Sequence, residues 1–136
     1  MASGYGRLGA DDMTFRERRG GGPESCDVAG ALEAEGLAMR VWRFGPGHEM
    51  AYHRHKNQHE VYHLLSGGPQ EVLIDGETVT VDDGDWLRLH RDTPRRIQNT
   101  TADRTAVWLL IGVPPGEGIM DGIRLDPVTG QEIPRT

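Results

Sequence analysis

The side chains that could do chemistry are concentrated in residues 47–67, a stretch with five of the six histidines of the chain. His53 and His55 are two residues apart, so in a β-strand both face the same side, with Cα atoms about 7 Å apart. After a turn over residues 56–59, Glu60 begins a second strand and can bring a carboxylate to the same point. Two imidazoles and one carboxylate suit Fe, Mn, Co, Ni or Zn. The spacing therefore predicts a metal site on His53, His55 and Glu60.

A second motif overlaps the first. His59 to His63 reads H-E-x-x-H, which is the zinc-ligand pattern of helical metalloproteases. That pattern needs a helix, because in a strand the two rings stand about 13 Å apart. Val61 and Tyr62 favour a strand, and Gly67 ends it. We therefore set the protease interpretation aside and expect His59 in a solvated turn.

The elements that must position these residues are short strands separated by Gly, Pro and Asp, a texture typical of an all-β sandwich or barrel. Asp75-Gly76 predicts a two-residue hairpin turn of the primed type. The expected strands are LAMRVWRF, EMAYHRH, EVYHLL, QEVLI, ETVTV, DWLRL, RRIQN and AVWLLIGV.

The expected organisation is an N-terminal arm over residues 1–26, a barrel domain over 27–113 and a C-terminal surface strap over 114–136. The GGGPES run at residues 20–25 reads as a linker. Asp27 is a suitable N-cap for a short helix that ends before Gly36. The tryptophans at 42, 86 and 108 are expected in the core.

The net charge, the cysteine count and the lengths of the apolar runs limit the kinds of partner and compartment that we expect. The net charge of −6 argues against a nucleic-acid partner, because no basic stripe could follow a phosphate backbone. A single cysteine excludes an intrachain disulfide, and the cytoplasm is the expected compartment. No apolar run approaches membrane-spanning length, so no membrane association is expected. A small molecule is the expected partner.

In the histidine stretch and the strands expected around it, the chain resembles the small single-domain members of the cupin superfamily. Gly47, His53, His55, Glu60 and Gly67 reproduce the first cupin motif, GxxxxxHxHxxxxExxxxxxG. The resemblance implies a double-stranded β-helix, or jelly-roll barrel, with the site in its mouth and, usually, a homodimer. It implies His53, His55 and Glu60 as ligands of a divalent metal ion.

The second motif, GxxxxxPxGxxHxxxN, is matched with departures. Gly84 and Asn99 are present, but His90 replaces the proline and Asp92 replaces the glycine. The usual fourth ligand, a histidine, is replaced by Arg95. Arginine stays protonated and has no lone pair to offer, so it cannot bind a metal ion.

Two readings of Arg95 stay open. In the first, an ion binds the three remaining ligands and Arg95 holds an anionic substrate beside it. In the second, the guanidinium replaces the ion and pairs with Glu60, leaving the histidines as donors or acid–base groups. A fixed cation beside a divalent ion is unfavourable at low dielectric, which favours the second reading if Arg95 points inward. The intact histidines and Glu60 favour the first.

Strand parity places Tyr62 and Leu64 on the inward face with Glu60, and Val61 and Leu65 on the outward face, where they could form a dimer interface. Tyr62 is a candidate pocket donor and, with Arg95, a candidate catalytic residue. The working hypothesis is a metal-binding enzyme acting on a small, anionic organic molecule, by a dioxygenase-, isomerase- or cyclase-like reaction. The alternative is a metal-free binding or catalytic cupin.

Overall fold

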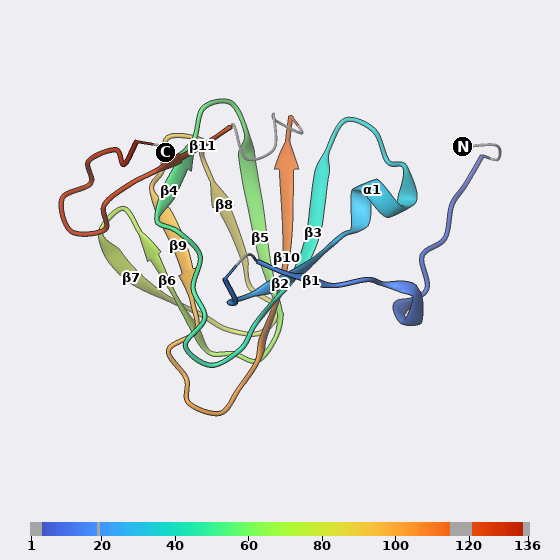
Figure 1. Ribbon diagram of the computed structural model, residues 1–136, viewed down its shortest axis with the longest axis horizontal. Helices are drawn as coiled ribbons and strands as arrows, with labels where there is room; N and C mark the ends of the chain where they lie inside the picture. Colours follow the sequence, from blue (N-terminus) through green and yellow to red (C-terminus); the bar gives the residue numbers. More distant parts are fainter. Residues whose placement is uncertain (1–3, 19, 115–120, 135–136) are drawn as a thin grey trace.

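The computed structural model describes residues 4–18, 20–114 and 121–134. Its strands form two sheets in which every pairing is antiparallel. Figure 1 shows the sheets as two walls, with β3, β5 and β10 in one and β6, β7 and β9 in the other. The expected jelly-roll architecture is confirmed. Within the described ranges, no helix is long and apolar enough to cross a membrane.

The larger sheet has six strands in the order β1-β2-β3-β10-β5-β8. Their bounds are β1 Arg16–Glu17, β2 Glu24–Asp27, β3 Ala38–Phe44, β10 Ala106–Val113, β5 His59–Ser66 and β8 Trp86–Leu89. The smaller sheet has five strands in the order β11-β4-β9-β6-β7. Their bounds are β11 Gly122–Arg124, β4 His53–His55, β9 Arg95–Gln98, β6 Gln70–Ile74 and β7 Glu77–Val81.

The core lies between the sheets, because alternate residues of each strand face the opposite sheet. In β10, Ala106, Trp108 and Leu110 are buried and the residues between them are half-buried. Fully burying a side chain of the size of leucine stabilises the fold by about 1.5–3 kcal/mol. The core cluster is Phe44, Met50, Tyr62, Leu64, Val72, Val81, Leu89, Ile97, Ala106, Trp108 and Leu110.

One core prediction is wrong: Trp86 is 59% exposed. It pairs in register with His63, which faces outward on β5, while the neighbouring Leu87 pairs with the inward Tyr62. Directly opposed residues of two strands share a face. Trp86 therefore lies on the outer face of the edge strand β8, where it stacks on the His63 ring at 3.6 Å between centroids.

The connections follow the expected turn chemistry. Asp75 and Gly76 have φ values of 51° and 80°, as the primed hairpin turn between β6 and β7 requires. Gly67, the last residue of the first motif, has φ 88°, and a Cβ there would run into the carbonyl oxygen of Thr105. Only glycine fits at that position.

The single α-helix of the described residues, α1 Val28–Leu32, is shorter than the sequence predicts; a 3-10 turn, η1 Ala10–Asp12, precedes it in the arm. Asp27 is the N-cap as expected, since its side chain accepts a hydrogen bond from Gly30 N at 2.9 Å. The helix ends at Glu33, whose left-handed φ of 53° closes the C-terminus before Gly36.

The arm and the strap both contribute strands. β1 pairs with β2, and β2 pairs with β3, so part of the expected arm belongs to the larger sheet. The GGGPES run is not a spacer: residues 20–23 lie in the turn between β1 and β2, and Glu24 and Ser25 begin β2. On the strap side, β11 pairs with β4 and places this segment next to the histidines. Residues 115–120 of the strap lie outside the described part of the chain.

Candidate metal centre

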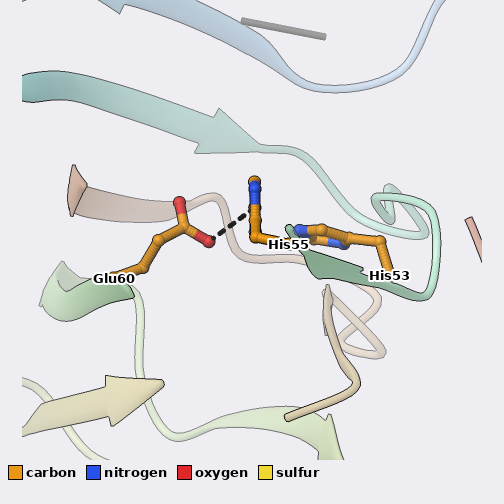
Figure 2. Close-up of side chains that lie close together, drawn as sticks. All are labelled: His53, His55 and Glu60. Atoms are coloured by element: carbon orange, nitrogen blue, oxygen red, sulfur yellow. Dashed lines mark ion pairs between the residues drawn. The ribbon is translucent and has the colours of Figure 1, made fainter. Parts of the chain in front are cut away.

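The histidines and the carboxylate come from strands of opposite sheets and meet in the barrel. His53 and His55 are the two ends of β4, and Glu60 is the second residue of β5. The histidine ring centroids are 5.1 Å apart, and one ligand atom from each of the three residues lies within 4.8 Å of the others. Figure 2 shows the Glu60 carboxylate directed at the His55 ring, with His53 beside it.

Each imidazole is held through its Nδ1 atom. His53 Nδ1 lies 2.7 Å from the carbonyl oxygen of Ala51, and His55 Nδ1 lies 2.9 Å from Asp121 Oδ2. Both partners are acceptors, so each Nδ1 carries the proton and donates it. The Nε2 atoms are then left to face the cluster. A hydrogen bond from the remote nitrogen to an oxygen is the usual way in which metal-binding histidines are oriented.

Glu60 Oε1 accepts several hydrogen bonds. Arg95 Nη2 donates to it at 2.6 Å and the Tyr62 hydroxyl at 3.2 Å, while His55 Nε2 lies 3.0 Å away. Burial alone would raise the pKa of Glu60, but the contact with His55 and the charge of Arg95 lower it to about 2. The carboxylate is therefore ionised at neutral pH.

Arg95 points inward and is completely buried. Besides Glu60, its guanidinium donates to the carbonyl oxygens of Thr93 at 2.8 Å and His90 at 3.3 Å, and Nε donates to the Tyr62 hydroxyl at 3.4 Å. The side chain does not line the cavity. An anchoring role for a substrate needs accessible donors, so the hypothesis that Arg95 binds an anionic substrate directly does not fit this geometry.

His53 is neutral at physiological pH. Burial, followed by the positive charge of Arg95, lowers its pKa to about 4. Because Nδ1 carries the proton, Nε2 keeps its lone pair. The residue is thus prepared to bind a cation or to accept a proton without first losing one.

Tyr62 is fully buried against Trp108 and forms part of the cavity wall. Burial and the nearby Glu60 charge raise its pKa far above the usual value. The phenol therefore keeps its proton and acts as a hydrogen-bond donor to Glu60. The predicted inward orientation is confirmed.

The remaining histidines lie outside the cluster. His59 and His90 form an edge contact with 4.6 Å between ring centroids, and His59 Nδ1 accepts from Arg91 N at 3.4 Å. His63 stacks on Trp86 on the outer face. His48 Nδ1 accepts from Gly45 N in the turn after β3. H-E-x-x-H lies on strand β5, as expected for a motif that is not a protease helix.

Asp121, which is 1% exposed, belongs to no motif in the sequence. Besides His55, its carboxylate accepts hydrogen bonds from the backbone N–H groups of Asn57 and Gln58, both at 3.1 Å. Burial would raise the pKa of Asp121, but the hydrogen bonds from His55 and the backbone lower it. An Asp-Gly pair in a segment that reads as a strap carries no signal for this role.

A cavity of about 810 Å³ opens onto the cluster. His53, His55, Glu60 and Tyr62 form part of its wall, and the β1–β2 turn, β3, β11 and the segment before β4 supply most of the rest. The size suits a small organic molecule. The site is therefore accessible from outside the barrel.

The residues fit a divalent cation. Two imidazoles, each held through Nδ1, and one ionised carboxylate converge, and this mixed N/O donor set suits the metals expected from the sequence. His55 Nε2 and Glu60 Oε1 are close enough that a proton or another cation must lie between them. Arg95 is bonded to Glu60 from behind, as the outer partner of a ligating carboxylate can be.

The sequence matches the Cupin domain family model over residues 40–112, and no curated protein matches it. Among solved structures, a sugar phosphate isomerase of the cupin superfamily from Silicibacter pomeroyi has a TM-score of 0.74 at 17% identity, with 96% of this chain and 93% of that chain covered. A polyketide cyclase from Streptomyces resistomycificus has a TM-score of 0.68 at 18% identity, covering 79% and 78%.

A predicted oxalate decarboxylase from Thermotoga maritima has a TM-score of 0.67 at 19% identity, covering 79% of this chain and 98% of that chain. At such identities these structures share the fold, and the reactions named for them differ from one another. The family model, in contrast, covers more than half of the sequence, including both motifs and the three clustered side chains. The chain belongs to the cupin family.

Proposed function

We propose that this cupin is an enzyme that holds a divalent metal ion on His53 Nε2, His55 Nε2 and Glu60 and acts on a small anionic organic molecule in the barrel cavity. The observation that carries the proposal is the orientation of the two imidazoles. Both Nδ1 atoms are bound to fixed oxygens, so both Nε2 atoms face the carboxylate. A cluster with a purely structural role would not need this shared orientation next to a cavity.

When bound, the ion would supply Lewis acidity towards a substrate oxygen. The protein groups have separate tasks. His55 and Arg95 together keep Glu60 ionised, and Asp121 fixes the ring of His55. Tyr62 keeps its proton and orients the Glu60 carboxylate. The solved structures named above include an isomerase, a cyclase and a predicted decarboxylase, which supports an enzyme-like role on a small molecule and leaves the reaction type as a proposal.

A second candidate function is favoured by the 2.6 Å contact between Arg95 and Glu60. In this alternative the guanidinium neutralises the carboxylate permanently, and His55 bridges Glu60 and Asp121 as a proton carrier. The cavity then binds or converts its ligand without a metal ion. His53 would be the group able to accept a proton, since its Nε2 atom is unprotonated.

The metal content of the purified protein distinguishes the metal-dependent enzyme from the metal-free alternative. Protein purified without a nickel column should contain close to one equivalent of Fe, Mn, Co, Ni or Zn by elemental analysis, and the paired substitution of His53 and His55 by Gln should abolish it. Chelator should lower the thermal midpoint of the parent and leave that of the Gln pair unchanged, because a bound ion stabilises the folded state.

Arg95→His serves as the matched variant, since it restores the usual fourth ligand. If the parent is metal-free and Arg95→His acquires an ion, the metal-free alternative holds for the parent. A metal-free parent whose midpoint is insensitive to chelator would refute the metal-dependent enzyme.

A further inference from the structure

Two arginines in the wall of the cavity come from segments outside the family match. Arg18 follows β1 in the N-terminal arm, and Arg124 ends β11 in the C-terminal strap. Both lie beyond residues 40–112. The common cupin barrel thus supplies the cluster, and the terminal segments of this chain add positive charge beside it.

Arg124 is held next to His53 by the register of the sheet. It is the direct partner of His53 in the β11–β4 pair, while Ile123 is opposite Arg54. Directly opposed residues share a face, with Cβ atoms about 4.5–5.5 Å apart. Arg124 therefore projects to the same side as His53, into the cavity. Arg54 projects to the other side and pairs with Glu132 at 2.6 Å.

Arg18 is positioned by the tight turn between β1 and β2. Its backbone N–H donates to the Pro23 carbonyl oxygen at 3.1 Å, and its carbonyl oxygen accepts from Gly21 N at 3.0 Å. Gly21 and Gly22 have φ values of 89° and 103°, which glycine adopts without strain. The turn residues line the cavity together with Arg18. In Figure 1 the blue β1–β2 segment crosses the lower part of the larger sheet, and its turn is directed towards the smaller sheet.

The other ionic side chains of the wall are already paired. Glu60 is bonded to Arg95, Arg40 lies 3.8 Å from Asp27, and Glu49 lies 3.9 Å from Arg96. Each of these three pairs joins a positive and a negative side chain, so their charges cancel.

Arg18 and Arg124 have no ion-pair partner among the described residues. A chain with a net charge of −6 therefore presents unpaired positive charge in its cavity. A concave site lined by one sign of charge concentrates ligands of the opposite sign.

We propose that Arg124 and Arg18 form a subsite for an oxyanion, a carboxylate or a phosphate ester of the substrate, next to His53. Arg124 is the principal contact, because the sheet register fixes it beside the cluster. The inference deepens the proposed function and rests on it only for taking the cavity as the substrate site. Anion binding at the two guanidinium groups does not require a metal ion.

The full chain, kept in chelator, is titrated with inorganic phosphate and separately with malonate, following the amide signals of Gly122 and Trp42 by NMR together with calorimetry. Both probes should saturate, with the changes centred on the cavity wall. Arg124→Ala should weaken binding about tenfold, as expected for loss of a charged hydrogen-bond donor. Arg18→Ala should weaken it less, and Arg124→Lys should restore part of the loss.

Arg91→Ala is the matched control, because it removes one exposed arginine outside the cavity and should leave binding unchanged. Tighter binding of phosphate would indicate a phosphate ester as the substrate group, and tighter binding of malonate a carboxylate. The proposal is overturned if the parent binds neither probe, if both alanine variants bind as the parent does, or if neutral glycerol gives the same shifts. Since chelator is present throughout, absence of a metal ion from the native protein would leave this result intact.

Discussion

At the scale of single residues, the position of Arg95 has the largest consequence. A buried arginine at a usual ligand position brings a permanent positive charge into the cluster, and Glu60 is where that charge is neutralised. Breaking a buried ion pair leaves an uncompensated charge, which is costly. Arg95 therefore acts on the site through Glu60 and through its electrostatic effect on His53.

The lowered pKa of His53 predicts a loss of stability in mild acid. The unfolded chain takes up this proton near pH 6.5, while the folded protein takes it up only at about pH 4. Between these values the unfolded state binds more protons, so the free energy of unfolding falls as pH falls. The loss is on the order of 3 kcal/mol, and it should be measured by urea unfolding in chelator between pH 7 and pH 4.

His53→Gln is the control, and its stability should be nearly flat over the upper part of that range. Glu60 affects stability in a separate pH range. Its pKa is lowered from about 4.5 to about 2, so its contribution to the free energy of unfolding is lost only below pH 4.5. A parent whose stability does not change between pH 6.5 and pH 4.5 would contradict the assignment to His53.

At the scale of elements, the C-terminal segment is part of the site. β11 pairs with β4, and Asp121, just before it, binds both His55 and the turn that leads to β5. A carboxylate that accepts from His55 and from the backbone N–H groups of Asn57 and Gln58 fixes the relative position of the two strands. The distance between His55 and Glu60 therefore depends on a residue more than sixty positions away in the sequence.

Asp121→Asn should lower the affinity for Co²⁺ or Zn²⁺ about 10- to 100-fold, as is usual for outer-shell partners of metal ligands. The metal-free protein offers an independent readout, because the Nδ1 proton of His55 should lose its strong acceptor and its NMR signal should broaden or shift. Asp126→Asn is the matched control, since Asp126 lies in the same segment and accepts from the turn N–H groups of Val128 and Thr129. Equal effects of the two variants would show that Asp121 has only a general structural role.

The elements differ in how well the sequence predicts them. Strand β5 is predictable, because Val61 and Tyr62 favour a strand and parity then places Tyr62 beside Glu60. The Asp75-Gly76 hairpin is predictable because few residues adopt two successive positive φ values. Both depend on local chemistry. The first motif likewise placed His53, His55 and Glu60 together, because its intervals match two strands and one turn.

The remaining features depend on contacts between distant segments. β2 and β11 join sheets through partners far away in sequence, and neither has a pattern that sets it apart from a loop. Tryptophan is a residue type usually found in the core, but the register with His63 places Trp86 on the outer face. Arg95 points inward, but the carbonyl oxygens of Thr93 and His90 that accept from its guanidinium belong to a turn whose geometry the sequence does not encode locally.

At the scale of the whole molecule, the outer face of the larger sheet carries a partly exposed apolar patch on β10 and β5 among the described residues, flanked by Arg43 opposite Val107 and Arg88 opposite Val61. On β10, Leu109 and Ile111 pair in register with His63 and Val61 of β5, so these side chains lie side by side on the outer face. Trp86 continues the face at 59% exposure and Leu65 at 46%. The arm covers only the β3 end, where the Arg43 guanidinium lies over the Phe15 ring.

We expect a second copy of this chain to cover that face and give a homodimer, as the resemblance to small cupins implies. An apolar patch on a central strand pair suits a two-fold contact, because the same patch of each copy meets that of its partner. Leu109→Glu should therefore convert the dimer to a monomer by sedimentation equilibrium, since it introduces a charge that would be buried without a partner. Thr78→Glu, on the exposed edge strand β7 of the other sheet, should leave the dimer intact. A parent that sediments as a monomer at every concentration would refute the interface, whereas dissociation by both variants would place it elsewhere.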